Sequence, residues 1–428
     1  MLRRWIEDEV DGTLKNSDAL NDVFDRFVDG VSVFKDREVL RHDYLPDRLP
    51  HREEQIRKLG ETVAPVLKGA RCSNVFIYGQ TGTGKTAVAK YVLCHLEAKA
   101  KELGAAVKFG YVNCRIAGSD YRVLANLSQN VGVSVPFTGL STGEVFDRLR
   151  EGIESSKVIY IAVLDEADAL AKPRGDSLLY ELTRVNETLR YSKVALIGIS
   201  NDLRLKEFLD PRVLSSLSEE EIVFRPYDAA ELKNILSERA SAGFRENNLS
   251  DSALGLCAAL AAAEHGDARR ALDLLRVAGE VAERKGIDVV TEEHVREAEK
   301  HIEHNRVIEA LQNLTLHSKL VVLGVYRICG RNAQGASTGE IFGVYTGLCV
   351  ELGITPLTQR RLSALVNELD VMGIATAKIV SMGRYGRTKK IRLGIMRNVV
   401  REVFGPDARL GRFIGTESRC VDHSSSGS

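Results

Sequence analysis

GQTGTGKT, at residues 79–86, decides the fold, because it matches the phosphate-loop pattern GxxxxGK(S/T). An apolar run, NVFIY at 74–78, precedes it, and a helical pattern follows it. A strand, a glycine-rich loop and a helix in this order form a cradle for phosphate groups. Gly79, Gly82 and Gly84 permit the turns that direct backbone N–H groups at phosphate oxygens. The motif therefore predicts a nucleotide site within a parallel α/β sheet.

The remaining residues of the loop supply charge and a metal ligand. Lys85 places a positive charge near the outer phosphates, and Thr86 offers a hydroxyl group to Mg²⁺. The helix that begins near Lys85 directs the positive end of its dipole at the same anion. We therefore expect ATP or ADP with Mg²⁺ as the cofactors. The predicted nucleotide-binding residues of the loop are Gly79, Gly82, Thr83, Gly84, Lys85, Thr86 and Ala87.

A second strand pattern, VIYIAVLD at 158–165, ends in a carboxylate. Asp165 should therefore lie at the carboxyl edge of the sheet, where open α/β sheets bind ligands. We expect Asp165 to hold Mg²⁺ and Glu166 to orient or deprotonate an attacking water. Alternatively, this Asp-Glu pair caps the next helix. Asn201 ends a further strand pattern, and we expect its amide to position the same water.

Charge is unevenly distributed along the 428 residues, although the formal net charge is zero. Residues 305–428 carry 17 Lys+Arg against 9 Asp+Glu, a balance of +8, so residues 1–304 carry −8. This division is typical of a protein that brings one part to a polyanion, although a modest surplus also serves solubility. No apolar run reaches the length of a membrane span, and the seven cysteines lie singly. We expect a cytoplasmic, nucleoid-associated protein with reduced thiols and no membrane partner.

The C-terminal part shows three helical patterns followed by two extended segments. The second helix opens with a capping box, Ser337 and Glu340, and the third, at 355–373, opens with Thr355 as its cap. A hairpin at 374–394 follows, and its connection is basic. This order predicts a winged helix whose third helix enters the DNA major groove, although such domains also bind proteins. The expected DNA contacts are Arg360, Ser363 and Asn367 on the helix, and Arg384, Arg387 and Lys389 on the wing.

Four stretches carry a family resemblance: DEADAL (165–170), ISND (199–202), LDPRVLSSL (209–217) and GDARRALDLLRVAGEVAE (266–283). Together they resemble the archaeal initiator family of AAA+ P-loop ATPases, which is similar to the largest origin recognition complex subunit and the Cdc helicase loader. The implied fold is α/β: a parallel sheet flanked by helices, an all-α lid and a C-terminal winged helix. The expected division is an N-terminal arm at 1–45, an ATPase base at 46–226, a lid at 227–304, a winged-helix domain at 305–415 and a disordered tail at 416–428.

The resemblance also implies roles for single residues. Asn201 would be the first sensor of the γ-phosphate, Arg269 the second, and Arg212 an arginine finger acting on a neighbouring subunit's ATP. Tyr227 and Arg239 would contribute to the ATP site. Arg239 also stands out by pattern, because it continues an apolar helix stripe and so needs a counter-charge or a phosphate.

Three alternatives remain open at this point. Arg270 can take the place of Arg269, since the two are adjacent. Arg212 can instead pair with the acidic run SEEE (218–221), and Arg239 can form an ion pair within the lid. The family also places an adenine-covering segment near 43–56 and a further DNA contact near 120–145.

The resemblance implies an ATP-dependent replication initiator. It would bind double-stranded origin DNA and help recruit or load the replicative helicase, with slow ATP hydrolysis as a conformational switch. Paralogous initiators are further expected partners. A DNA-binding regulatory paralogue is the alternative, and a clamp-loader or remodelling motor would require stable rings without a basic C-terminal domain.

Overall fold

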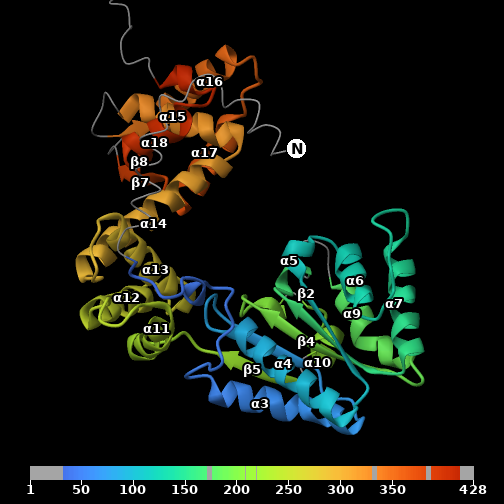
Figure 1. The fold of residues 1–428 in the computed structure, drawn as a ribbon. Helices are drawn as coiled ribbons and strands as arrows, with labels where there is room; N and C mark the ends of the chain where they lie inside the picture. The colour runs from blue at the N-terminus through green and yellow to red at the C-terminus, as the bar shows by residue number, and fades with distance from the viewer. Residues whose placement is uncertain are drawn as a thin grey trace, which may run out of the picture. The chain divides into compact units, whose positions relative to one another are not determined.

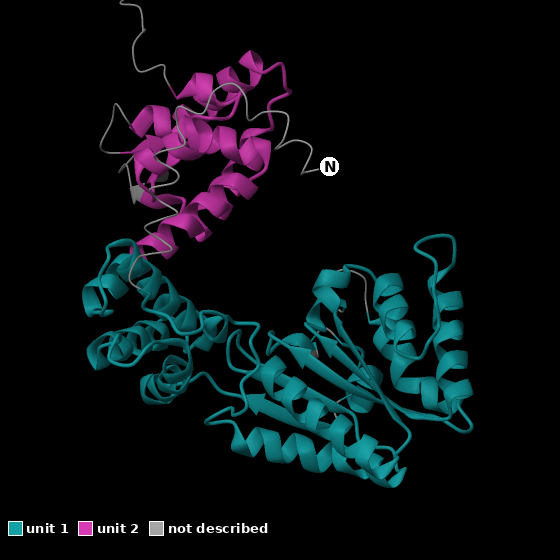
Figure 2. Cartoon of the chain, viewed as in Figure 1, with its two compact units in different colours: residues 1–298 teal, residues 299–428 magenta. Residues whose placement is uncertain are grey.

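The computed structural model describes residues 32–170, 176–207, 209–217, 219–329, 335–381 and 387–414. The chain divides into two compact units, Met1–Ala298 and Glu299–Ser428 (Figure 2). The boundary between them falls within one helix, α14 (Glu292–Asn313). Within the described ranges, no helix is long and apolar enough to cross a membrane. The predicted tail at 416–428 lies outside the described residues, as does most of the predicted arm.

A five-stranded parallel sheet of order β2-β3-β4-β1-β5 forms the centre of the first unit (Figure 1). The four predicted strands, at 74–78, 107–113, 158–165 and 194–200, are confirmed to within a residue at each end. A fifth was not predicted, because EEIVF at 220–224 carries two acidic residues and becomes a strand only by pairing with β1. The strands are β1 (Val75–Gly79), β2 (Val107–Asn113), β3 (Ile159–Asp165), β4 (Lys193–Ser200) and β5 (Glu220–Phe224).

Helices cover both faces of this sheet, which explains why the strands are apolar on both sides. Val75 and Ile77 of β1 pack with helices α3 and α4, whereas Phe76 and Tyr78 pack on the opposite face with α6, α7, α9 and α10. Short α5 follows β2 directly. The helices are α3 (Glu53–Val63), α4 (Lys85–Leu103), α5 (Cys114–Ala117), α6 (Asp120–Gln129), α7 (Thr142–Ser156), α9 (Ser177–Arg184) and α10 (Pro211–Leu217).

The lid is helical, as the family resemblance implies. Asp228 and Glu231 form a capping box that starts its first helix, and Asp267 caps its third. A segment that we call the N-terminal strap, residues 33–50, reaches this lid: the rings of Phe34 and Phe244 lie 4.9 Å apart, centroid to centroid. The lid helices are α11 (Ala229–Gly243), α12 (Asp251–Ala263), α13 (Ala268–Arg284) and the first part of α14.

The second unit is a winged helix, in which an antiparallel sheet of order β6-β8-β7 packs with the helices. The capping box of Ser337 and Glu340 is confirmed. The predicted start of the third helix is wrong: Thr358, not Thr355, caps it, because the Thr358 side chain accepts the N–H of Arg361. Short β6 and α18 were not predicted. The elements are α15 (Leu316–Cys329), β6 (Ala336–Ser337), α16 (Thr338–Glu351), α17 (Gln359–Val371), β7 (Ala375–Ser381), β8 (Arg387–Leu393) and α18 (Arg397–Phe404).

Candidate functional site

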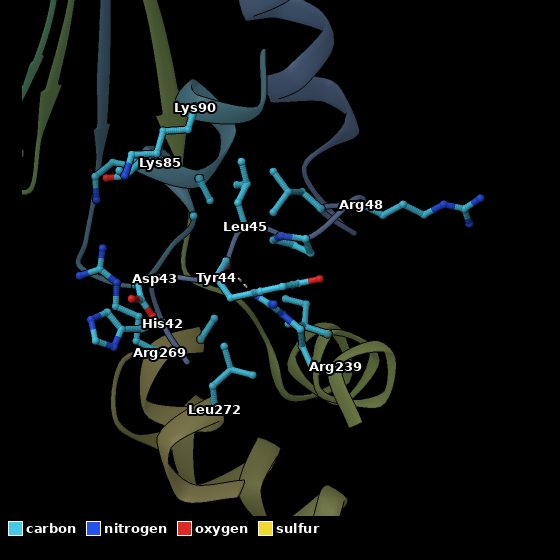
Figure 3. Close-up of a pocket in the computed structure, with 18 of the residues that line it drawn as sticks. His42, Asp43, Tyr44, Leu45, Arg48, Lys85, Lys90, Arg239, Arg269 and Leu272 are labelled. Carbon is cyan, nitrogen blue, oxygen red and sulfur yellow. Dashed lines mark hydrogen bonds between the residues drawn. The ribbon is translucent and has the colours of Figure 1, made fainter. Parts of the chain in front are cut away.

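A cavity of about 670 Å³ lies within the first unit, between the phosphate loop, the N-terminal strap and the lid helices α11 and α13 (Figure 3). Its volume falls inside the range of roughly 300–1,000 Å³ that small-molecule sites occupy. Most of the predicted nucleotide residues form its wall, whereas Gly79, Thr83 and Arg212 do not. The predicted residues on the wall are Gly82, Gly84, Lys85, Thr86, Ala87, Asp165, Glu166, Asn201, Tyr227, Arg239 and Arg269.

The glycines of the phosphate loop shape the loop, and their lack of a side chain also leaves room for residues of the lid. Gly82 and Gly84 adopt left-handed φ angles of 73° and 89°. A Cβ at Gly82 would lie 1.7 Å from the Asp267 Oδ1, and one at Gly84 would lie 2.8 Å from the Tyr227 hydroxyl. The backbone N–H of Ala268 also donates to the Gly82 carbonyl at 3.1 Å. The loop and the lid therefore touch through positions where no side chain fits.

Lys85 begins α4 and is buried against its own loop. Its Nζ donates to the carbonyls of Gly79 at 2.8 Å and Gln80 at 2.6 Å. Burial lowers the pKa of the Lys85 ammonium to about 8, while the neighbouring Asp165 carboxylate acts in the opposite direction. A buried cation whose hydrogen bonds, among the described residues, go to carbonyls is well suited to a phosphate, because a nearby anion would stabilise the charged form that burial disfavours.

Asp165 and Thr86 meet at the carboxyl edge of the sheet. The Thr86 hydroxyl donates to the Asp165 Oδ2 at 2.9 Å, and the Tyr111 hydroxyl donates to the same oxygen at 2.7 Å. Both bonds go to the Oδ2 of Asp165, whereas its Oδ1 accepts the backbone N–H of Glu166 at 2.9 Å. A carboxylate and a hydroxyl are hard oxygen ligands, and the pair therefore fits Mg²⁺.

Glu166, the next residue, has a left-handed backbone conformation and lies beside Arg115. Its φ of 52° lies in the left-handed region, which is uncommon for a residue other than glycine. The Glu166 Oε2 lies 2.7 Å from the Arg115 Nε, and Arg115 also lies 3.3 Å from the Asp168 carboxylate. The Glu166 contact is ionic rather than an aligned hydrogen bond. Its carboxylate is thus held toward α5, at the edge of the cavity.

The structure separates the two adjacent arginines of the lid. Arg269, in the first turn of α13, reaches the cavity wall, whereas Arg270 forms an ion pair with Glu264 at 3.0 Å. Asn201, directly after β4, lines the same cavity from the base. Arg269 and Asn201 therefore approach one cavity from two different parts of the unit.

Arg239 holds the strap. Its guanidinium donates to the carbonyls of Val39 at 2.9 Å and Tyr44 at 3.0 Å, and it lies 4.7 Å from the centroid of the Tyr44 ring (Figure 3). Across the described ranges it makes no salt bridge, which argues against the alternative of an ion pair within the lid. Tyr227 is buried on the wall of the same cavity, with its hydroxyl beside Gly84.

Arg212 lies away from the cavity. It is exposed at the start of α10 and, in the part of the chain that the structure describes, forms no ion pair. The acidic run that was its alternative partner is engaged elsewhere: Glu219 pairs with Arg71 at 3.2 Å, and Glu220 with Lys58 at 3.7 Å. The pairing alternative is therefore wrong for these two carboxylates.

The winged helix presents its predicted DNA residues from α17 and the neighbouring strand. Arg360 and Asn367 are exposed, while Ser363 is half-buried. The Lys389 Nζ donates to the Asn367 Oδ1 at 2.6 Å, which joins β8 to α17. Arg384 lies outside the described residues, and for Arg387 only the backbone is described, as the first residue of β8. A buried stripe faces the core: Leu362, Leu365, Val366 and Leu369.

Comparison with known proteins agrees with this arrangement. Residues 69–204 match the AAA domain family, 233–300 the Cdc6 AAA+ ATPase-type lid domain, and 309–403 the CDC6 C-terminal winged helix domain. An ORC1-type DNA replication protein from Thermococcus onnurineus is 49% identical over 395 residues, which cover 91% of this chain and 95% of that relative. This chain belongs to the family of ORC1-type DNA replication proteins.

Solved structures of related proteins have the same fold as this chain. The structure of the Aeropyrum pernix ORC1 protein in complex with DNA is 49% identical, with a TM-score of 0.81, and the match covers 89% of this chain and 99% of that one. The Aeropyrum pernix ORC2 protein, solved as ADPNP-ADP complexes, is 25% identical with a TM-score of 0.58 over 87% of this chain and 98% of that one. The chain therefore has a nucleotide-binding AAA+ ATPase domain, a lid and a winged helix.

Two residues of this ORC1-type site were missed by sequence reasoning. Tyr111 lies two positions before the end of β2, on the edge strand that runs beside β3, and only the strand register brings it to Asp165. A buried arginine, Arg52, lies behind the phosphate loop. The sequence offers no distinct signal for Arg52, because an arginine before a charged helix is ordinarily exposed.

Proposed function

We propose that this chain is an ATP-controlled initiator of DNA replication, which binds double-stranded origin DNA and helps to recruit or load the replicative helicase. The observation that carries the proposal is that the lid and the phosphate loop meet at one cavity. Because Arg269 and Asp267 of the lid lie beside Gly82 and Lys85 of the base, a bound nucleotide would contact both and would bias the lid position.

The site residues divide into binding and chemistry. Gly79, Gly82, Thr83, Gly84 and Ala87 shape the loop whose backbone receives the phosphates, and Lys85 neutralises them. Thr86 and Asp165 would hold Mg²⁺, which supplies positive charge at the β- and γ-phosphates. Glu166 would accept a proton from the attacking water, and Asn201 would position that water. Hydrolysis is slow, since Glu166 must first leave the Arg115 contact.

The lid residues would report the state of the nucleotide. Arg269 senses the γ-phosphate from α13. Tyr227 and Arg239 shape the walls nearer the hinge and the strap, so that closing the lid also closes the strap over the nucleotide. Exposed Arg212 acts on the ATP of a neighbouring initiator in a side-by-side assembly.

The winged helix would supply most of the DNA contacts. Arg360, Ser363 and Asn367 of α17 enter the major groove, and Arg384, Arg387 and Lys389 of the wing contact the adjacent backbone. The +8 balance of residues 305–428 and the DNA complex of the Aeropyrum pernix relative support this assignment. Exposed Phe137, in the loop between α6 and α7, adds a contact from the ATPase unit. A nucleoid-associated, cytoplasmic location follows from this function.

Footprinting on origin DNA tests the proposal, with a matched pool of unrelated fragments of the same length. Arg360→Ala and Arg387→Ala are expected to weaken protection and to reduce its salt dependence, because each removes a phosphate or base contact. Arg409→Ala, an exposed arginine of the same unit, is the control and should leave protection unchanged. Equal protection of origin and unrelated DNA by the wild-type protein would contradict the proposal.

The nucleotide arm of the test uses Lys85→Ala. This variant is expected to lose ATP affinity and with it any difference in footprint between ATP and ADP. Unaltered ATP affinity would show that the phosphate loop is not the nucleotide site. If the wild-type footprint is the same with ATP and with ADP, the protein binds DNA but the proposed nucleotide switch is wrong.

A further inference from the structure

Arg52 immediately precedes α3 and is 1% exposed, which makes it the most buried charged side chain among the described residues. Its planar guanidinium donates to three main-chain carbonyls. The Nε reaches the carbonyl of Thr83 at 2.9 Å, the Nη1 that of His51 at 2.9 Å, and the Nη2 that of Arg225 at 2.8 Å. Arg52 therefore joins its own segment to two distant pieces of backbone at once.

Aromatic rings surround the same guanidinium. Its central carbon lies 3.7 Å from the centroid of the Tyr227 ring and 5.5 Å from that of Phe224. Within the described ranges no carboxylate forms a salt bridge with Arg52, so carbonyls and rings stabilise its charge. Burial lowers the pKa of the guanidinium, although arginine stays protonated.

Each of the three carbonyls lies in or directly beside one of the parts that surround the cavity. His51 adjoins the C-terminal end of the N-terminal strap, and Thr83 lies in the phosphate loop between the two glycines that contact the lid. Arg225 lies between β5 and α11, where the chain passes from the base into the lid. Tyr227, stacked on Arg52, is on the cavity wall. Arg52 itself is not on that wall and so does not reach the nucleotide.

We propose that Arg52 is a positioning residue that couples the phosphate loop to the hinge of the lid, so that phosphates bound at the loop set the position of the lid. The inference rests on the proposed nucleotide switch and identifies the connection through which that switch acts.

The chemistry of the guanidinium explains why the coupling is tight. If the hinge moved without the loop, a buried N–H donor would lose the Thr83 or the Arg225 carbonyl, and a buried donor without a partner is costly. The two backbone segments therefore move together. Lysine cannot make the same contacts as Arg52, because its ammonium group is compact and lacks the planar guanidinium that donates to several acceptors in fixed directions.

The test compares Arg52→Lys and Arg52→Ala with Arg57→Ala. Arg57 is an exposed arginine on the same helix, α3, and serves as the matched control. Affinities for ADPNP and ADP are measured by titration calorimetry with Mg²⁺ present. Amide hydrogen exchange is followed in peptides covering the phosphate loop (79–86) and the hinge (225–240), and thermal melting is recorded without nucleotide.

In the wild type and in Arg57→Ala, ADPNP should protect the hinge amides more than ADP does. In Arg52→Lys, the loop amides should still be protected by both nucleotides, but the hinge should no longer distinguish them. The affinity for ADPNP should fall about ten-fold, within the range of couplings between sites, and that for ADP much less. Methylguanidine should partly restore the hinge response of Arg52→Ala, because it returns the missing group to its cavity.

Three outcomes would overturn the inference. If Arg52→Lys keeps the wild-type difference between ADPNP and ADP at the hinge, Arg52 does not carry the coupling, although the switch itself stands. If both affinities fall equally together with the melting temperature, Arg52 is a structural residue only. If the wild type shows no difference between the nucleotides, there is no coupling to carry, and the proposed switch is wrong as well.

Discussion

A methyl group at Gly82 should separate the lid from the phosphate loop. The Cβ of Gly82→Ala would lie 1.7 Å from the Asp267 Oδ1 and 2.1 Å from its Cγ, so the Asp267 side chain must move. Asp267 caps α13 by accepting the backbone N–H groups of Arg269 at 2.8 Å and Arg270 at 3.3 Å. The substitution therefore combines a left-handed alanine with a lost helix cap.

The magnitude follows from these two parts. A left-handed φ of 73° costs an alanine about 1–2 kcal/mol, and a lost N-cap costs about 1 kcal/mol. Gly82→Ala should therefore destabilise the first unit by about 2–3 kcal/mol, and Asp267→Ala by about 1 kcal/mol. In the double variant the cap is lost only once. Its destabilisation should match that of Gly82→Ala alone, about 1 kcal/mol less than the sum of the single variants.

Urea unfolding followed by circular dichroism measures these free energies of unfolding for the first unit. Gly104→Ala is the control, since Gly104 has a left-handed φ of 66° and open space around its Cβ position. It should show the conformational cost of about 1–2 kcal/mol and additivity with Asp267→Ala. Additivity of Gly82→Ala with Asp267→Ala, to within about 0.5 kcal/mol, would refute the contact between the loop and the lid.

Three further predictions concern the nucleotide and DNA sites. Burial holds the folded-state pKa of Lys85 at about 8, below the ordinary 10.5. Between these two pH values the unfolded chain binds one more proton than the folded protein, so the free energy of unfolding without nucleotide should rise with pH in this window. Affinity for ADP should fall over the same window as the cation is lost, and calorimetric titration of Lys85→Met should show a flatter profile. Arg115→Ala frees the Glu166 carboxylate from an exposed ionic contact, so kcat for ATP hydrolysis should rise by up to about five-fold with KM unchanged; a lower kcat would assign Arg115 to catalysis instead. Arg360→Ala should reduce the slope of log affinity for DNA against log salt by about one, as measured by fluorescence anisotropy, and an unchanged slope would remove Arg360 from the DNA face.

Local patterns were sufficient for much of the nucleotide site. The phosphate loop, Asp165 and Asn201 each follow an apolar strand, and the carboxyl ends of parallel strands meet at one edge of a sheet. The capping box of Ser337 and Glu340 could be predicted equally well, because both partners lie within four residues of each other. Where a cap had to be chosen among several threonines, the pattern failed, and Thr358 rather than Thr355 starts α17.

Contacts between distant parts of the chain could not be predicted from local patterns. The strand Glu220–Phe224 exists because β1 offers it an edge, and its own residues give little sign of it. The pattern predicted a phosphate, or alternatively a carboxylate of the lid, as the partner of Arg239, and it gave no sign of the two strap carbonyls that Arg239 contacts in the structure. An arginine has five donors and accepts either kind of partner, so its sequence position cannot select one.

The sequence by itself therefore predicted the chemistry of this ORC1-type protein: a loop for phosphates, a carboxylate for a metal and a basic winged helix for DNA. These features depend on residues that are neighbours in the chain. Only the tertiary structure decided which lid arginine reaches the cavity, why Gly82 and Gly84 tolerate no side chain, and where Arg52 directs its donors. Each of these depends on at least one contact between segments more than a hundred residues apart, and packing of the whole unit rather than any local pattern sets that contact.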